Sequence, residues 1–301
     1  MRAPDAAGGA GTVARATDLV LRYGDHTAMR ASSFTIPVGA VTAVIGPNGS
    51  GKSTVLNAIA GLVEPSAGSL EVLGRTPLEA RSRVSYVLQS VTVPVGTPLT
   101  VAETVGMGRY PNLGLWRRRR DKDRRRVESA IDQLDIADLA HRHLTELSGG
   151  QRQRVYVAQG IAQSHEVLLL DEPLTGLDLV SARTIDGIIH SERHRGCSVV
   201  LTTHDLDEAR AADHVLLMNG RVVASGPPEQ VLTTRNLEIA YGLGALHGLT
   251  VAFVDDPSHP REPGAPPERR ELEQGAGQAP SGEGHGEAGE HAGNEVDHRD
   301  G

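Results

Sequence analysis

The chain has 301 residues, 39% of them hydrophobic, which is enough to bury a sizeable core in one or two domains. A single cysteine, Cys197, excludes an internal disulfide, and no apolar run approaches the roughly 20 residues that cross a bilayer. The formal net charge of −8 comes entirely from residues 255–301, which hold 12 acidic residues and 4 Arg. An aromatic fraction of 3% gives no base-stacking platform, which argues against nucleic-acid binding.

Short β-branched runs alternate with helical patterns, which predicts an α/β fold with a mostly parallel sheet. Residues 1–16 lack the apolar core of a signal peptide, and we expect a flexible N-terminus there. Two runs are typical of an antiparallel edge, Thr17–Tyr23 and Ser33–Ile36. The other expected elements follow in chain order: strand Val41–Ile45, helix Ser53–Gly61, then strands Ser69–Leu73, Arg83–Leu88, Val167–Asp171, Ser198–Thr203, His214–Met218 and Arg221–Ala224.

A helical stretch interrupts this alternation. Residues 99–147 show no strand signal, and their apolar positions are spaced for one buried helical face, which predicts an inserted helical subdomain. Its Arg-rich segment, 117–126, is interpreted as a solvated surface balanced by Asp121 and Asp123, with contact to anionic lipid as the alternative. Cys197 is expected to be a small apolar residue at the start of a buried strand.

The composition changes after residue 254. Gly, Pro, Glu and His replace apolar residues there, so we expect residues 17–254 to fold and 255–301 to form a disordered acidic tail. A solvated linker is the favoured interpretation of this tail. Weak metal binding is the alternative because imidazoles stand among carboxylates at His259, His285, His291 and His298.

A glycine-rich string, GPNGSGKST at 46–54, lies between an expected strand and an expected helix. It fits the spacing G-x-x-x-x-G-K-[ST], in which small residues let backbone N–H groups converge on phosphate oxygens at the positive end of a helix. Lys52 is predicted to reach the β- and γ-phosphates, and the Ser53 hydroxyl to bind Mg²⁺. The predicted phosphate-binding residues are Gly46, Asn48, Gly49, Ser50, Gly51, Lys52, Ser53 and Thr54.

Two further motifs complete the predicted site. The buried strand 167–170 ends in Asp171, predicted to hold Mg²⁺, and Glu172, predicted to orient the attacking water as general base. The string LSGGQ at 147–151 opens a helix, and its N–H groups form a second anion-binding nest. One compact subunit would place this nest too far from the glycine loop, which suggests that two chains clamp a nucleotide between them.

In order and spacing these motifs resemble those of the ATP-binding subunits of ABC transporters, from about Thr17 to Gly242: Walker A GPNGSGKST, signature LSGGQRQR and Walker B VLLLDEP. The resemblance implies an α/β P-loop NTPase cassette with a mostly parallel RecA-like core, an antiparallel β edge subdomain and the helical subdomain. It also implies an ATPase that binds ATP and Mg²⁺ and dimerises with a second copy around ATP. The other implied partners are an integral membrane permease and, indirectly, a solute-binding protein, with the chain on the cytoplasmic face of the membrane.

The resemblance also assigns roles to single residues. Tyr23 looks like the aromatic that stacks on adenine, Gln89 like the residue that senses Mg²⁺ and water, and His204 like the switch histidine at the γ-phosphate. Asp178 looks like the acid at the dimer interface, although Thr175-Gly176 replaces the Ser-Ala that often precedes it. The signature residues expected to cap the partner's γ-phosphate are Ser148, Gly149, Gly150 and Gln151.

Resemblance at a finer level, to one subfamily of these ATPases, indicates which substrate is transported. The stretches 107–110 and 216–242 look like those of zinc and manganese uptake ATPases, and siderophore or cobalamin importers, which share the first stretch, are the alternative. A soluble ABC ATPase of DNA repair or ribosome function is less consistent with one cassette and no long heptad run. A nucleotide-binding module without turnover is less consistent with the presence of Glu172 and His204.

Overall fold

The structure is a computed structural model that describes residues 11–89, 98–113 and 121–242. The chain divides into residues 1–250 and 251–301, and the second unit, with the expected tail 255–301, lies outside the described residues. Residues 1–10 also lie outside them. No helix in the described part of the chain is long and apolar enough to cross a membrane.

A three-stranded antiparallel sheet has the order β2-β1-β4. β1 (Thr12–Tyr23) and β2 (His26–Pro37) form a hairpin whose turn contains Gly24 at φ 55°, and β4 (Ala67–Val72) pairs with the other edge of β1. The expected antiparallel edge is therefore present. Its boundaries were wrong, because pairing with both neighbours extends β1 back to Thr12, into the segment expected to be flexible.

The larger sheet has six strands in the order β5-β6-β7-β3-β8-β9. Neighbouring strands from β5 to β8 pair in parallel, and only β9 runs antiparallel to its neighbour. This confirms the prediction of an α/β fold with a mostly parallel sheet. The strand bounds are β3 Val41–Ile45, β5 Val84–Val87, β6 Val167–Leu170, β7 Ser198–Thr203, β8 His214–Met218 and β9 Val222–Gly226.

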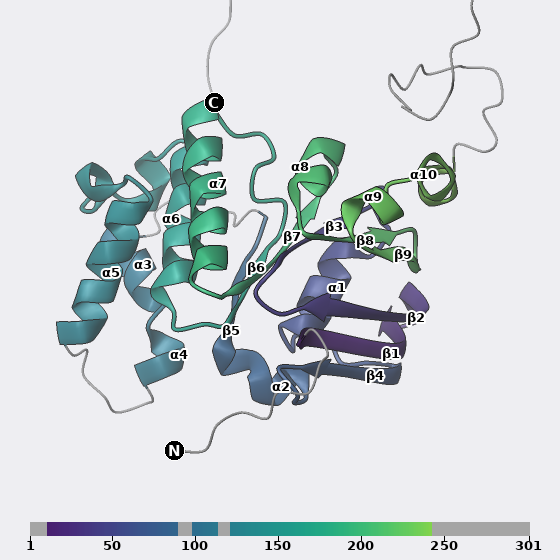
Figure 1. The fold of residues 1–301 in the computed structure, drawn as a ribbon. Helices are drawn as coiled ribbons and strands as arrows, with labels where there is room; N and C mark the ends of the chain where they lie inside the picture. Colours follow the sequence, from purple (N-terminus) through teal and green to yellow (C-terminus); the bar gives the residue numbers. More distant parts are fainter. Residues whose placement is uncertain (1–10, 90–97, 114–120, 243–301) are drawn as a thin grey trace, which may run out of the picture. The chain divides into compact units, whose positions relative to one another are not determined.

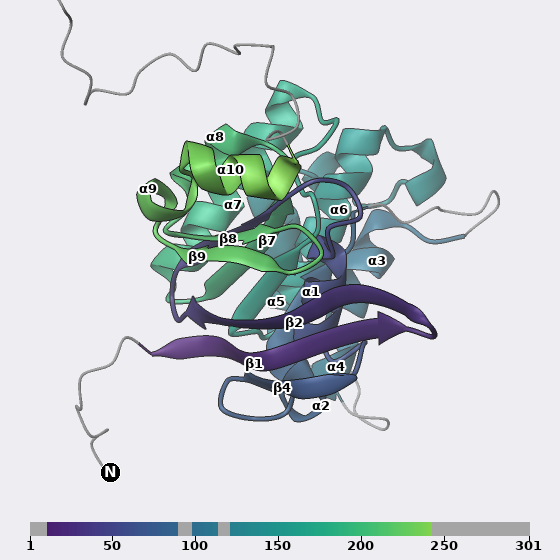
Figure 2. The ribbon, with the colours of Figure 1, turned by 90° about the vertical axis from the view of Figure 1, so that its right-hand side faces the viewer.

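Both faces of this sheet are covered, which explains the uninterrupted apolar run in β6. Leu168 and Leu170 pack into the cluster formed with α6 (Gly149–Ala162) and α7 (Leu179–His194). Val167 and Leu169 pack on the other side, with α1 (Lys52–Ile59) and the small sheet. Figures 1 and 2 show these layers, with α1 between the two sheets. The shorter helices are α2 Pro77–Ala80, α8 Leu206–Ala211, α9 Pro228–Val231 and α10 Thr234–Tyr241.

The described part of the stretch from Leu99 to Leu147 consists of helices joined by turns and short loops. It contains α3 (Val101–Met107), α4 (Tyr110–Leu113), α5 (Asp121–Gln133) and two 3₁₀ turns, with no strand among the described residues. α3 and α5 pack against the signature helix α6. The predicted helical subdomain is thus anchored to the same helix that carries LSGGQ.

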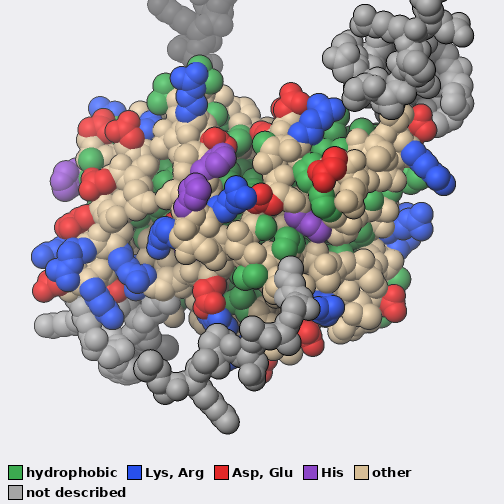
Figure 3. Space-filling model, viewed as in Figure 1, with side chains coloured by type: hydrophobic (Ala, Val, Ile, Leu, Met, Phe, Trp, Pro, Cys, Tyr) green, Lys and Arg blue, Asp and Glu red, His purple; other side chains and the backbone are tan. Residues whose placement is uncertain are grey.

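One charged residue of α5 contradicts the solvated interpretation of this segment. Asp123 is buried and pairs with the buried Arg109 guanidinium at 2.8 Å, because helix periodicity turns this carboxylate inward. Arg109 also donates to the carbonyl oxygen of Ala162, which joins α5 to the end of α6. Asp121 and the basic side chains of α5 are exposed, and Figure 3 shows the blue side chains gathered over this helix.

Replacing Leu169 by Ala tests the two-sided burial of β6. Its side chain has no solvent exposure, so Leu169→Ala should lower the free energy of unfolding by about 2–5 kcal/mol. Urea denaturation followed by circular dichroism measures the change. The control is Leu78→Ala in α2, where the side chain is 56% exposed and the change should stay within about 0.5 kcal/mol. Equal losses for the two variants would contradict this account of the core.

Candidate active site

The glycine loop connects β3 to α1, and its backbone packs closely against the backbone of other segments of the same chain. A Cβ on Gly46 would lie 2.2 Å from the carbonyl oxygen of Met218, so only glycine fits there. Gly51 has φ 97° and immediately precedes α1 without a side-chain cap on the helix. The first N–H groups of α1 therefore remain available to an anion.

The side chains of the loop also suit an anionic ligand. The Ser50 hydroxyl is buried and has no hydrogen-bond partner among the described residues, whereas Asn48 and Gly49 are exposed and Thr54 is buried in α1. Lys52 is buried and donates to the carbonyl oxygens of Gly46 at 2.9 Å and Pro47 at 3.3 Å. Burial lowers the pKa of the Lys52 ammonium, although the charges of Glu172 and Asp171 act in the opposite direction.

The Asp171 carboxylate, at the end of β6, joins three elements. Its Oδ1 accepts from the Ser53 hydroxyl of α1 at 3.1 Å and from the Thr202 hydroxyl of β7 at 2.5 Å. Its Oδ2 accepts from the Tyr86 hydroxyl of β5 at 3.4 Å. Burial, followed by the charge of Asp171, raises the pKa of Tyr86, so this phenol stays protonated as a donor.

Glu172 stands beside Asp171 with a left-handed backbone, φ 45°. Its backbone N–H donates to the Thr202 hydroxyl at 2.8 Å, and its Oε2 accepts from the Gln89 amide at 2.6 Å. The His204 Nδ1 lies 3.9 Å from the same oxygen, and the His204 side chain is 57% exposed. The structure therefore brings together Gln89, Glu172 and His204, which lie in three separate segments of the sequence.

Tyr23 lies at the end of β1 with 47% of its surface exposed. Its hydroxyl accepts from the Asn57 side-chain amide of α1 at 3.2 Å. The ring is thus held beside the helix that follows the glycine loop, with a face open to solvent. Such an exposed ring can stack on a planar ligand.

The signature residues belong to a different helix start. Ser148 caps α6: its hydroxyl accepts from the Gln151 N–H at 3.2 Å, and the Gln151 side chain accepts from the Ser148 N–H at 3.0 Å. Gly149 and Gly150 are the first residues of the helix. Among the described residues no hydrogen bond joins this segment to the glycine loop, and the starts of α1 and α6 are two separate places where backbone N–H groups could face an anion.

Asp178 caps α7 and packs against the signature. Its two carboxylate oxygens accept from the Ser181 N–H at 2.9 Å and the Ser181 hydroxyl at 2.8 Å, and these bonds lower its pKa. A Cβ on Gly150 would lie 2.3 Å from the Asp178 Oδ2. Within one chain, Asp178 therefore lies so close to this signature position that only glycine fits there without a shift of the carboxylate.

Sequence reasoning missed three side chains of this site: Thr202, Tyr86 and Asn57. Thr202 carried a usable signal, because alternate residues of a strand share a face and it stands two residues before His204. Tyr86 lies in β5, three residues before Gln89, but no pattern in the surrounding sequence indicates that its hydroxyl reaches Asp171. Asn57 carried no signal, since its contact depends on how α1 lies against β1.

Comparison with known proteins agrees with this geometry. The ABC transporter family profile matches residues 29–175. The chain is 37% identical to the chelated iron transport system membrane protein YfeB of Yersinia pestis, over 78% of this chain and 81% of that protein. It is 35% identical to the manganese transport system ATP-binding protein MntB of Listeria innocua, over 74% and 94% of the two chains, and 37% identical to the zinc transport system ATP-binding protein TroB of Treponema pallidum, over 75% and 85%.

Solved structures give the same result for the fold. A metal-chelate type ABC transporter in an inward-facing conformation superposes with a TM-score of 0.67 at 29% identity, covering 76% of this chain and 89% of that one. CbiO1 of Clostridium perfringens, part of the ABC transporter complex cbiONQ, has a TM-score of 0.63 at 26% identity, covering 79% and 99%. Given the glycine loop, the paired acids after β6 and the signature at the start of α6, the chain belongs to the ABC transporter family, as a nucleotide-binding ATPase subunit.

Proposed function

We propose that this chain hydrolyses ATP to drive uptake of a metal ion, zinc or manganese, through a membrane permease. The observation that carries the ATPase part is the meeting of the glycine loop with the two acids after β6, where Ser53 and Asp171 lie 3.1 Å apart. Gln89 and His204 approach Glu172 from two further elements. Phosphate-binding amides, a cation-binding pair and a poised carboxylate are the parts that phosphoryl transfer to water requires.

The residues present fit a bound Mg²⁺. Two neighbouring ligands of an octahedral Mg²⁺ lie about 2.9 Å apart, since each bond is about 2.0–2.1 Å long. The Ser53 Oγ and the Asp171 Oδ1 already have nearly that separation, and both are the hard oxygen donors that Mg²⁺ prefers. When bound, the cation neutralises charge on the phosphate oxygens. The side-chain carbonyl oxygen of Gln89 would be a third ligand of the same hard type.

Glu172 is proposed as the general base. Its carboxylate is 14% exposed, and the Gln89 amide fixes one oxygen, so the other can accept a proton from an attacking water. His204, on the exposed side, is placed to contact the γ-phosphate. Lys52, which among the described residues donates to two backbone carbonyls, can swing to the β- and γ-phosphates.

The working unit is proposed to be a dimer with ATP between the subunits. Two features of the surface support it. First, the N-terminal amides of α6 do not contribute to the glycine loop of their own chain. Second, Leu179 and Val180, which directly follow Asp178, are 65% and 62% exposed. A second copy would cover these apolar side chains and bring its signature to the phosphates bound by the first copy.

The proposed cargo rests on the relatives, because this subunit does not have to touch the transported ion. YfeB is named for chelated iron, MntB for manganese and TroB for zinc. All three are named for transport of metals, which supports metal import and keeps siderophore-type cargo as the alternative. Attachment to the membrane would then depend on the permease subunit.

Glu172→Gln tests the general base. The amide keeps the size of the side chain and removes its basicity, so the purified protein should still bind ATP while its turnover falls at least about 10²-fold. Steady-state phosphate release and equilibrium binding of a fluorescent ATP analogue measure the two quantities. Near-normal turnover would remove Glu172 from this role.

Thr202→Val tests whether the Thr202 hydroxyl positions both acids. Losing it leaves the Glu172 N–H and one bond of Asp171 without a partner, so the variant should lose about 1–3 kcal/mol of stability. The ATP turnover should fall and the Mg²⁺ concentration for half-maximal turnover should rise several-fold, with Thr202→Ser restoring both. Thr42→Val in the neighbouring β3 is the control, because the Thr42 hydroxyl has no partner among the described residues. An unchanged Mg²⁺ requirement in folded Thr202→Val would limit Thr202 to a structural role.

Cellular metal content tests the cargo. In a deletion strain grown under metal limitation, zinc or manganese should fall, and wild-type protein but not Glu172→Gln should restore it. Total zinc, manganese and iron are measured together by mass spectrometry. A fall in iron alone would move siderophore-type cargo ahead, and no change in any metal would contradict metal import while leaving the ATPase proposal standing.

A further inference from the structure

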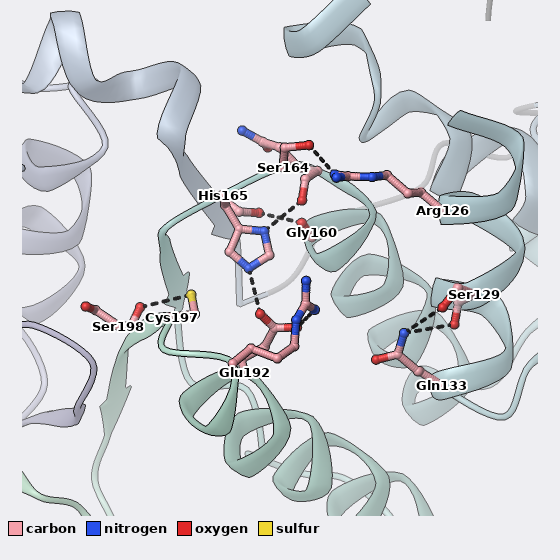
Figure 4. Close-up of polar contacts among 12 residues, drawn as sticks. Arg126, Ser129, Gln133, Gly160, Ser164, His165, Glu192, Cys197 and Ser198 are labelled. Atoms are coloured by element: carbon pink, nitrogen blue, oxygen red, sulfur yellow. Dashed lines mark hydrogen bonds and ion pairs between the residues drawn. The ribbon is translucent and has the colours of Figure 1, made fainter. Parts of the chain in front are cut away.

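A second cluster of metal-binding side chains lies at the opposite end of the parallel strands. His165 stands two residues before the start of β6, Glu192 stands in the last turn of α7, and Cys197 directly precedes β7. One ligand atom from each of the three lies within 4.8 Å of the others. Figure 4 shows the imidazole and the carboxylate pointing toward one another, with the sulfur beside them.

The hydrogen bonds of His165 leave an unusual arrangement of lone pairs. Its Nδ1 lies 2.9 Å from the Gln163 carbonyl oxygen, which can only accept, so Nδ1 carries the ring hydrogen. Its Nε2 then directs a lone pair at the Glu192 Oε2, 3.1 Å away. Two lone pairs at this distance require a cation between them. That cation is either a proton shared between the two atoms or a metal ion.

The groups around the cluster hydrogen-bond to its side chains, as the neighbours of metal ligands usually do. A metal-binding histidine usually donates its other N–H to a carbonyl or carboxylate, and a ligating carboxylate is itself hydrogen-bonded. Here the Gln163 carbonyl fixes the ring, and the Arg195 guanidinium holds the Glu192 Oε1 at 2.6 Å, which leaves Oε2 for a cation. The Cys197 N–H donates to the Glu192 carbonyl oxygen at 3.0 Å, which ties the backbone of the two ligands together.

The cluster is also buried, which makes an unfilled cationic position costly. The side chains of His165 and Glu192 are each 2% exposed. Burial alone would raise the pKa of Glu192, but the hydrogen bonds and charges of His165 and Arg195 outweigh it and lower the pKa. Burial, followed by the charge of Glu192, raises the pKa of the Cys197 thiol to about 12, so the thiol is protonated until a metal displaces its proton.

We propose that His165, Glu192 and Cys197 bind one divalent cation of the zinc class, through Nε2, a carboxylate oxygen and Sγ. Imidazole, carboxylate and thiolate together suit Zn²⁺, whereas a sulfur ligand disfavours Mg²⁺. Zinc bonds of about 2.0 Å to nitrogen and 2.3 Å to sulfur place those atoms roughly 3.5 Å apart, so the side chains close by little more than 1 Å. Binding releases the thiol proton and the proton shared by Nε2 and the carboxylate to solvent.

This site does not depend on the transported substrate. It lies where β6 and β7 begin, whereas Asp171 and His204 follow the ends of these strands. A bound cation would join the end of α7 to the starts of both strands. It would therefore stabilise the folded chain in a concentration-dependent way, whatever the permease carries.

The single cysteine allows a selective test on the full-length protein. Co²⁺ is added to reduced, chelator-treated wild-type protein without nucleotide, and absorption is followed in the near ultraviolet. A thiolate-to-Co²⁺ charge-transfer band can come only from Cys197, so the histidines of 255–301 do not contribute to it. The expected result is a band that saturates at one Co²⁺ per chain, disappears on addition of Zn²⁺ and is absent in Cys197→Ser.

Further variants assign the other two ligands. His165→Gln and Glu192→Gln should each weaken Co²⁺ binding at least about tenfold. The matched control is His190→Gln, in the same helix as Glu192, where an exposed imidazole lies 3.5 Å from Asp186. The control should bind Co²⁺ as the wild type does. Equal affinities for His165→Gln and the control would overturn the assignment of His165.

A second measurement needs no variant. Zn²⁺ should slow alkylation of Cys197 in the native wild-type protein at least about tenfold, and excess chelator should reverse this protection. Mg²⁺ at the same concentration should not protect the thiol. Absence of both the Co²⁺ band and the Zn²⁺ protection in wild-type protein would overturn the site, and the three side chains would then form a proton-linked hydrogen-bond cluster. This result would leave the ATPase proposal unaffected.

Discussion

The position of the Asp171 carboxylate is the constraint on which the active site depends. It is 6% exposed, and a buried carboxylate is stable only when donors or cations surround it. Three hydroxyls, from Ser53, Thr202 and Tyr86, supply the donors, and each belongs to a different element. The two-sided burial of β6 holds the carboxylate in place, and the three donors hold the glycine loop, β5 and β7 around it.

This arrangement also explains how the chain brings its proposed reacting groups together. Thr202 contacts the Asp171 side chain and the Glu172 backbone at the same time, and His204 follows directly after the end of β7 at Thr203. A shift of β7 would therefore move both acids and the histidine together. Gln89 reaches the same place from the end of β5, on the other side of β6.

Local sequence patterns predicted the α/β fold, the glycine loop, the acids after the buried strand and the helical insert. These features are encoded within short segments, by strict spacing or by uninterrupted burial. Contacts between distant segments were not predicted. The inward turn of Asp123 toward Arg109 and the full length of β1 depend on partners that the local pattern does not specify. The expected roles of Tyr23, Asp178 and the signature residues concern a ligand or a second chain, and they remain predictions.

The backbone of Glu172 has a consequence for how this sequence can change. A left-handed φ of 45° is unfavourable for a residue with a side chain and easy for glycine. Selection for folding stability alone would therefore favour glycine at this position, although the replacement would lose the hydrogen bond from the Gln89 amide. The same residue carries the carboxylate proposed as the general base. A change to glycine would therefore relieve the backbone and remove the reacting group in one step.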